Sequence, residues 1–568
     1  MIGTSRLFAI GLALVPALTA AQEPSPSPAP PPAYAAPTAS ATASAATAPP
    51  ADGRPVLNLS LEEAVQRAMT SNVDIAVERF SPEQSELSVH ELTGVYEPTL
   101  TSTVQQNSRA SAAQNAFAGA QSVNTDTFTY NFGARQNLRT GGDLRVDFNN
   151  NRQSTNSVFQ SFNPSFGANL AASLAQPLLR NFRVDGTRYQ IKVAKKNREI
   201  SDVQFRQTVV NTIANVKNLY YDLLYTIDNL EAQRKSLSLA SKLVDENRIK
   251  VRVGTLAPLD VVAAESEQAG REEAVILAEA AVADAEDALK RAIFPGNDPA
   301  TWNTRVVPSD RPTAEPVRVD ALGAIDKALA GRTDVVATRK RLESSQYAIE
   351  YARNQLLPGV DLVAAYGASG VGGTFFEREG LGGTVIRTLP GGYNDALSDL
   401  FGRNYPTWTL GVNFSYPIFN RQADAAAARA RVSKDQSEAS LRRLEMQVTA
   451  EVRSAARAVD TNYKRVESTR AARGLQERRL DAETKKFAAG MSTNFLVTQS
   501  QRDLALAEVA QLRAIADYRK SLVNFDRVQE AGFSGTGGSG TVSISSGQTG
   551  SQTGSQTGSQ TGSNPDGF

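Results

Sequence analysis

The chain has 568 residues and a formal net charge of +1, because 60 lysine and arginine residues are almost balanced by 59 aspartate and glutamate residues. A chain of this length is too long for one compact core, and its balanced charge gives no sign of a nucleic-acid partner. It contains no cysteine, which excludes disulfide bonds, thiolate metal sites and lipid attachment through cysteine.

The first residues have the pattern of an export signal. Arg6 precedes an apolar run, and small residues follow around Ala20. This pattern predicts a signal peptide over residues 1–21. No later segment approaches the roughly 20 apolar residues of a membrane helix, so any passage through a membrane would have to use strands.

Two segments have compositions that cannot form a packed core. Residues 22–56 consist mostly of Pro, Ala, Ser and Thr, and we expect a disordered linker there. Residues 531–568 repeat Gly, Ser, Gln and Thr, and we expect a disordered tail.

Between these segments the sequence contains two similar halves. The same features recur at corresponding places: Leu61 with Ala321, Pro98 with Pro358, Pro177 with Pro417, and Gly254 with Gly490. Each half is therefore predicted to contain a helix, strands, a long helix, a turn and a shorter helix. The first repeat, a proline-rich linker and the second repeat are assigned to residues 57–294, 295–316 and 317–530.

Long helices dominate both halves. The predicted helical segments are residues 61–95 and 187–293 in the first repeat, and 321–356 and 421–530 in the second. Apolar residues recur at alternating steps of four and three, which is the stripe of a coiled coil, at Val209, Ile213, Val216, Tyr220, Leu223, Ile227 and Leu230. Without proline or glycine between Gly186 and Gly254, this segment can stay helical for about 65 residues, or roughly 100 Å. Gly254 and Gly490 are each predicted to end a long helix.

The predicted strands lie at about 97–177 in the first repeat, and at about 358–366 and 406–417 in the second. From residue 407 to residue 416 every second residue is apolar, which predicts one lipid face and one wet face. We expect three aromatic residues toward the strand ends to lie at the membrane interface: Tyr405, Trp408 and Tyr416. The alternative interpretation is an antiparallel sheet packed on a soluble core.

The two halves differ in their predicted strands. The first half contains an additional hairpin that turns at Gly141 and Gly142, so we hypothesise four strands there against two in the second half. The second half instead has a glycine-rich insertion at residues 367–404. It lacks the lysine and following helix of a phosphate loop, and we interpret it as an outer-face loop.

A sheet of so few strands cannot close into a barrel by itself, and an open edge cannot stay in lipid. The chain is therefore expected to oligomerise. The shorter helices placed end to end nearly match one long helix in length, which predicts a cylinder of helices around a central space.

These features together resemble the TolC-type outer membrane efflux protein family. The resemblance covers nearly all of residues 57–530 and is carried by the duplicated Leu-x-x-Ala-x-x-x-Ala helix start, the strand entries at Pro98 and Pro358, the strand exits at Pro177 and Pro417, and the turns at Gly254 and Gly490. It implies a mixed α and β fold with an internal two-fold repeat. Long antiparallel coiled-coil helices would form an α-barrel, and antiparallel strands would contribute to a transmembrane β-barrel shared within a homotrimer.

The same resemblance implies a function. The chain would be the outer membrane channel of a tripartite efflux or type I secretion system. It would act as a passive trimeric duct that carries substrates from a periplasmic adaptor (a membrane fusion protein) and an inner-membrane pump across the outer membrane. The expected surroundings are outer membrane lipid for the strands and periplasm for the helical domain, with no nucleic-acid partner.

Family positions carried over one by one assign adaptor contact to the two turns, at Gly254, Thr255, Leu256, Gly490, Met491 and Ser492. Asp260 matches an aspartate that in relatives helps to hold the closed aperture through charged links to the second hairpin. The corresponding second-hairpin positions here are Ser492 and Leu496, which cannot form those charged links. Two alternatives follow: a different set of gating contacts, or a looser closed state. Asp260 is equally interpreted as a carboxylate that faces the dipole at a helix start.

Enzyme chemistry is not expected. The sequence has no paired carboxylates on a plausible cleft, no Ser/His/Asp set and no ligand cluster, and its single histidine, His90, lies in a helical pattern. We expect no catalytic residue, no cofactor and no metal. Two alternatives to the channel are a periplasmic coiled-coil scaffold without a pore, and the adaptor itself, which would have one hairpin between flanking β domains.

Overall fold

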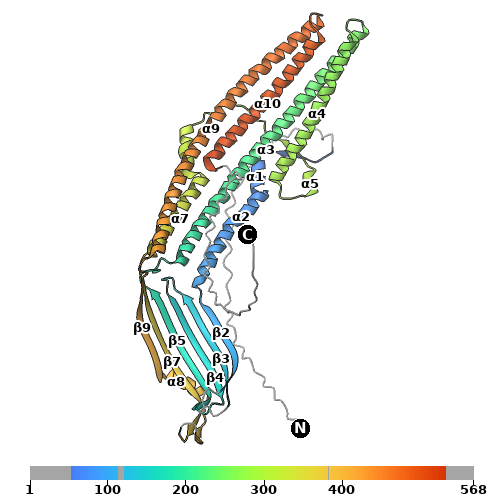
Figure 1. Ribbon diagram of the computed structural model, residues 1–568. Coiled ribbons are helices and arrows are strands. Elements are labelled where there is room, and N and C mark those ends of the chain that lie inside the picture. Colours follow the sequence, from blue (N-terminus) through green and yellow to red (C-terminus); the bar gives the residue numbers. More distant parts are fainter. Residues whose placement is uncertain (1–52, 113–120, 312, 381–382, 533–568) are drawn as a thin grey trace, which may run out of the picture. The chain divides into compact units, whose positions relative to one another are not determined.

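The computed structural model of the protein describes residues 53–112, 121–311, 313–380 and 383–532 (Figure 1). The predicted signal peptide, most of the predicted linker and all but two residues of the predicted tail lie outside the described residues. All the helices and strands belong to one unit of the chain, Arg54–Phe568.

Four long helices make two hairpins, α3 (Gly186–Arg252) with α4 (Pro258–Ile293) and α9 (Arg421–Ala488) with α10 (Asn494–Glu530). Their lengths are 67 and 36 residues in the first half and 68 and 37 in the second. Each long helix packs along the shorter helix that follows it, and α3 also packs against α10 (Figure 1). The stripe predicted for α3 is partly internal, since Val216, Tyr220 and Leu223 are fully buried.

Two shorter helices precede the strands in each half, α1 (Leu61–Ser71) and α2 (Val73–Thr93) in the first, and α6 (Ala321–Gly331) and α7 (Thr333–Asn354) in the second. The chain leaves the helical conformation between them, at Asn72 with ψ 128° and at Arg332 with ψ 135°. Asn72 caps α2, because its side-chain oxygen accepts hydrogen bonds from the backbone N–H groups of Asp74 (2.9 Å) and Ile75 (3.1 Å). α2 packs against α3, and α7 packs against both α3 and α9.

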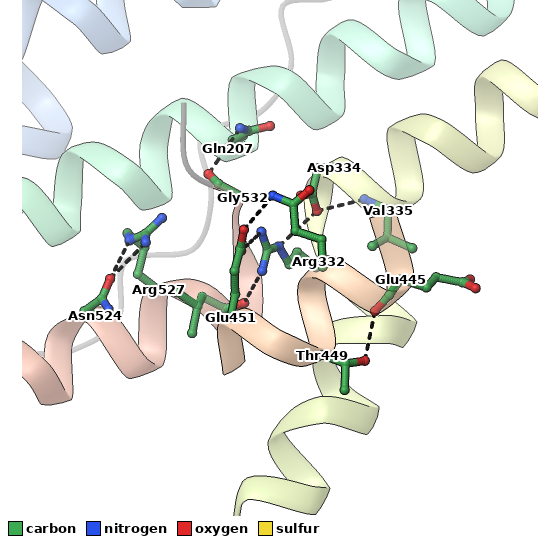
Figure 2. A network of polar contacts seen from close by, with 12 residues as sticks. Gln207, Arg332, Asp334, Val335, Glu445, Thr449, Glu451, Asn524, Arg527 and Gly532 are labelled. Carbon is green, nitrogen blue, oxygen red and sulfur yellow. Dashed lines mark hydrogen bonds and ion pairs between the residues drawn. The ribbon is translucent and has the colours of Figure 1, made fainter. Parts of the chain in front are cut away.

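The break at Arg332 is held by a polar network that joins distant parts of the second half (Figure 2). The guanidinium group is almost fully buried and contacts Glu451 of α9 at 2.6 Å and Asp334 at 3.0 Å. It also donates a hydrogen bond to the backbone oxygen of Val528 in α10 at 3.2 Å. Burial raises the pKa of the Glu451 carboxyl, but hydrogen bonds from Gln447 and Arg332 outweigh this and hold that pKa below its ordinary value.

Two apolar cores fix the segments before α1 and α6 to the long helices. In the first half Tyr220 donates a hydrogen bond to the backbone oxygen of Leu59 at 3.1 Å. In the second half Tyr518 donates to the backbone oxygen of Glu315 at 2.7 Å. A small parallel sheet, β1 (Val56–Leu59) with β6 (Arg305–Pro308), lies beside α3, and the short helix α5 (Pro299–Trp302) precedes β6. A second short helix, η1 (Gly94–Tyr96), lies between α2 and the first strand of the large sheet.

The remaining strands form one antiparallel sheet: β2 (Thr99–Ala112), β3 (Ser122–Asn137), β4 (Asp143–Thr155), β5 (Phe162–Pro177), β7 (Gly359–Arg378), β8 (Val385–Leu389) and β9 (Tyr405–Ser415). Neighbours follow the order β2, β3, β4, β5, β7, and both β8 and β9 pair with the other edge of β7. The first half supplies the four hypothesised strands of this sheet, and the second half supplies three, β7, β9 and the short β8, where two were hypothesised.

The glycine-rich insertion is not a loop from residue 367 onward, and that expectation is wrong. β7 continues to Arg378, and a short helix, α8 (Tyr393–Gly402), packs against it. A Cβ atom at Gly370 would clash with the backbone oxygen of Ala396, and one at Gly372 would clash with that of Gly392. These glycines therefore admit the close approach of α8 to an extended strand, which their composition alone does not distinguish from a loop.

Candidate functional site

The two hairpin turns have the same backbone geometry. Gly254 and Gly490 have φ values of +80° and +75°, which side chains disfavour. In the first turn the N–H groups of Gly254 and Thr255 donate to the oxygens of Val251 (3.0 Å) and Lys250 (2.9 Å). The second turn repeats both bonds, from Gly490 to Phe487 and from Met491 to Lys486. Each glycine thus closes its helix with a Schellman motif.

The two turns lie beside each other because α3 and α10 are bonded just behind them. Asn247 is fully buried and donates to the side-chain oxygen of Asn494 at 2.9 Å. Asn494 in turn donates to the backbone oxygen of Asp260 at 3.1 Å. An apolar cluster around Phe487 supports this contact, and the ammonium of Lys250 lies 3.5 Å from the Phe487 ring centroid.

Among the residues predicted at the turns, Gly254, Thr255, Gly490 and Met491 are exposed, Met491 by 74%, and Leu256 is half-buried. Ser492 follows Met491, and its hydroxyl group donates a hydrogen bond to the carboxylate of Glu483 in α9. Sequence reasoning missed two further exposed apolar side chains, Leu259 and Phe495. Each is the second residue of the helix after its turn. An apolar residue at the same position of both turns is the sequence signal that could have identified them.

Asp260 lies in the first turn of α4, where its carboxylate suits the positive end of the helix dipole. Among the described residues, no ion pair or side-chain hydrogen bond joins this carboxylate to the second hairpin. The connection uses its backbone oxygen and Asn494 instead. The corresponding second-hairpin positions are occupied by Ser492, bonded within its own hairpin, and Leu496, which is 41% exposed.

The large sheet has two chemically different faces. One row of paired residues crosses all the long strands and is apolar throughout: Leu100, Ala134, Val146, Ala172, Tyr366 and Trp408. The adjacent row on the other face is small or polar: Thr101, Gly133, Asp147, Ala171, Gly367 and Thr407. Several apolar-face side chains are highly exposed, among them Leu100 at 81% and Phe414 at 71%. In this band the alternation predicted for β9 recurs across the long strands, while farther along β2 and β4 the same face also carries polar residues such as Gln106 and Arg152.

The three predicted interface aromatics are all exposed but do not share one position. Trp408 lies on the apolar face opposite Tyr366. Tyr405 is the first residue of β9, and because it is three residues from Trp408 it belongs to the opposite face. Tyr416 directly follows the last residue of β9.

The short helix α8 lies on the apolar face of the sheet. Its Ala396 and Leu400 pack on Ala168 and Ala368. On the same face the polar side chain of Asn150 is only 1% exposed, because Tyr393 covers it and donates a hydrogen bond to its oxygen at 2.7 Å. α8 therefore shields this polar group from its surroundings.

None of the helices described here is both long and apolar enough to cross a membrane. Within the same described ranges, no group of three or more His, Cys, Asp or Glu residues is arranged to hold a metal ion.

Comparisons with known proteins agree with the predicted family and with the mixed α and β fold. A family model described as outer membrane efflux protein matches residues 143–293 and 324–528. The outer membrane protein TolC of Vibrio cholerae is 24% identical over 235 residues, which are 40% of this chain and 47% of TolC. The aligned part thus spans about half the length of that curated relative.

Two solved structures have the same fold. The Campylobacter jejuni CmeC outer membrane channel aligns with a TM-score of 0.57 at 15% identity, covering 83% of this chain and 85% of CmeC. The open state of the Neisseria gonorrhoeae MtrE outer membrane channel aligns with a TM-score of 0.56 at 15% identity, covering 83% and 89%. Because the family model matches more than half of the sequence, the chain belongs to the outer membrane efflux protein family.

Proposed function

We propose that this chain is the outer membrane channel of an efflux or secretion system. Three copies would form a passive duct that receives substrates from a periplasmic adaptor and an inner-membrane pump and conducts them across the outer membrane. The observation that carries this proposal is the sheet, in which an apolar row on one face crosses all the long strands beside a small or polar row on the other face.

In a membrane wall the apolar face contacts lipid and the polar face lines water. Leu100, Leu410 and Phe414 are exposed apolar side chains that would be covered by lipid rather than by protein. Trp408, Tyr405 and Tyr416 would lie near the membrane boundaries, with Tyr405 facing the lumen. The unpaired edges of a single sheet are not tolerated in lipid, so several copies must close one shared barrel.

The helices support a duct that continues beyond the membrane. Their lengths differ by one residue between corresponding members of the two halves, which favours an origin by duplication and a ring with nearly equal walls. In the proposed orientation the strands lie in the outer membrane, the helices in the periplasm, and the turns at Gly254 and Gly490 farthest from the membrane. Export through the predicted signal peptide is consistent with this location.

The turns are proposed to contact the adaptor. Exposed apolar side chains at the ends of helices are typical of protein contacts, and Leu259, Met491 and Phe495 supply them in both hairpins. Asp260 is the candidate aperture residue. Its link to the second hairpin through Asn494 would restrain the turns without the charged contacts of relatives.

The test of this function uses the full exported chain, purified from membranes. Its mass in detergent is measured by light scattering, and its current is recorded in a planar lipid bilayer. The proposal expects three chains per particle and stepwise currents without any pump. A chain that fractionates as a soluble protein and carries no current would instead establish the scaffold without a pore.

The turn assignment needs its own variants in the native cell. The substitutions Leu259→Asp and Phe495→Asp together should abolish export while trimer mass and bilayer current stay unchanged. Leu277→Asp is the matched control, because Leu277 is also exposed and lies within α4 away from its ends. Equal loss of export in both variants would contradict adaptor contact at the turns.

A further inference from the structure

We infer that neighbouring copies join through β9 of one chain and β2 of the next, in a register that places Phe414 opposite Val104, and that each copy contributes six full strands to the wall. This inference rests on the proposed trimeric duct and adds to it the residues of the seam and the size of the barrel.

The unpaired edges limit how copies can meet. Among the described strands, β2 lies at one end of the sheet, and β9 lies at the other beside the short β8; β2 and β9 each have one edge without a strand partner. Every pairing between them is antiparallel, so β9 runs opposite to β2. Pairing β2 with a second β2 would invert the neighbouring copy and put its helices on the other side of the membrane. Only β9 with β2 keeps all copies in one orientation and closes into a ring.

The register of this seam follows from the seam inside the chain. There β5, the last strand of the first half, pairs with β7, the first strand of the second half, and Leu174 lies opposite Ala364. Leu174 lies three residues before Pro177, as Phe414 lies three before Pro417. Ala364 lies six residues after Pro358, as Val104 lies six after Pro98. Carrying the internal pairing over therefore places Phe414 opposite Val104.

The faces of the sheet agree with this register independently. Phe414 and Val104 both belong to the apolar face and are 71% and 66% exposed in the single chain. The next pair, Ser415 with Thr103, belongs to the polar face on both strands. A slip of one residue would place apolar and polar side chains on the same face, which a wall between lipid and water does not tolerate.

The strands β2 and β3 belong to the wall and do not form a separate hairpin. β3 pairs with β2 from Ser122 to Arg135 and with β4 on its other side. Its apolar-face residues include Phe128, Tyr130 and Phe132. The family match begins at Asp143, the first residue of β4, so β2 and β3 lie outside the matched residues.

This arrangement sets the size of the barrel. The sheet has seven strands, of which β8 is a five-residue segment beside the outer part of β7, which leaves six long strands. Six strands from each of three copies make a wall of 18, a size at which barrels keep an aqueous channel.

Disulfide cross-linking tests the seam, and the natural chain has no cysteine to interfere. The double variant with Val104→Cys and Phe414→Cys is oxidised in membranes and analysed on a denaturing gel. Opposed residues of an antiparallel pair lie within disulfide distance, so we expect covalent trimers. A second pair, Thr103→Cys with Ser415→Cys, should cross-link in the same way from the polar face.

Matched controls separate this register from its neighbours. Val104→Cys with Ser415→Cys places the thiols on opposite faces, and it should give about tenfold less cross-linked product. Preferential cross-linking of Phe414→Cys with Ser102→Cys or Gln106→Cys overturns the register. Preferential cross-linking of Phe414→Cys with Val146→Cys of β4 overturns the place of β2 at the seam.

The mass and current of the unoxidised variants measure the proposed function separately. A conducting trimer that lacks the Val104–Phe414 cross-link contradicts the seam and leaves the duct intact. A monomer, or a particle without current, contradicts the duct itself and the seam with it.

Discussion

The two halves of the chain have nearly identical helices and very different sheet contributions. Helix lengths differ by one residue between corresponding long helices. The first half gives four long strands, while the second gives two, with β8 and α8 inserted between them. Helices packed in the proposed ring would constrain each other along their whole length. A sheet accepts another hairpin at little cost if both faces keep their polarity.

The halves also differ at the break between their short helices. At this point the first half has Asn72, which caps α2 and donates to the backbone oxygen of Ala292 at 2.8 Å. The second half has Arg332, whose buried charge is bonded to α9 and α10 (Figure 2). The same backbone conformation is thus stabilised by a neutral cap in one half and by an ionic network in the other.

We expect the largest effect from a substitution of Arg332, which removes the ionic network of the second half. Arg332→Ala removes the buried guanidinium that pairs with the partly buried Glu451 carboxylate, and we expect a loss of about 3 kcal/mol in the free energy of unfolding. Asn72→Ala removes a helix cap and should cost about 1 kcal/mol. Thermal unfolding followed by circular dichroism measures both. Equal losses would show that the charged network adds nothing beyond a cap.

The second prediction concerns the two faces of the sheet in both halves. Leu410→Lys in β9 and Leu170→Lys in β5 place a charge on the proposed lipid face, and each should cost about 2 kcal/mol of membrane-inserted stability. The controls Thr409→Lys and Asn169→Lys lie one residue away on the polar face and should insert normally. Membrane fractionation and resistance to protease report insertion. Similar behaviour of all four variants would contradict the assignment of the faces.

The third prediction tests whether the two turns are equivalent. Gly254→Ala and Gly490→Ala force a side chain into a left-handed conformation, and each should destabilise its hairpin by about 1 kcal/mol. Gly270→Ala in α4 and Gly474→Ala in α9 are matched controls, because a Cβ atom there meets nothing within 4 Å. These helical substitutions should be neutral or slightly stabilising. Hydrogen exchange near each turn measures the difference.

We expect the smallest effect from a deletion that removes the extra hairpin of the first half. Deletion of residues 99–142 joins Pro98 to Asp143 and leaves two strands in each half. Because barrel diameter grows roughly linearly with strand number, the lumen area and the single-channel conductance should fall to about half or slightly less. An unchanged conductance would mean that β2 and β3 do not line the passage.

The sequence predicted best what depends on neighbouring residues. The coiled-coil stripe around Tyr220, the turns at Gly254 and Gly490 and the alternation in β9 are local patterns with a fixed period. The extent of β7 was missed because Gly370 and Gly372 suit a loop as well as a close helix contact. The Arg332 network was missed because it joins residues far apart in the sequence, such as Glu451 and Val528.

The candidate site was predicted only in part for the same reason. The glycines of the turns follow from backbone conformation, whereas the exposure of Leu259 and Phe495 depends on which side of each helix packs against its neighbour. The contact of Asn494 with Asn247 and Asp260 likewise needs two hairpins side by side.

The most direct test of the account is an electron cryo-microscopy map of the full chain in lipid nanodiscs. We predict a three-fold ring whose membrane wall has 18 strands around a water-filled centre, with β9 of each copy beside β2 of the next. A single chain in the particle, or a centre filled by protein, would contradict the central claim that neighbouring copies build one hollow passage.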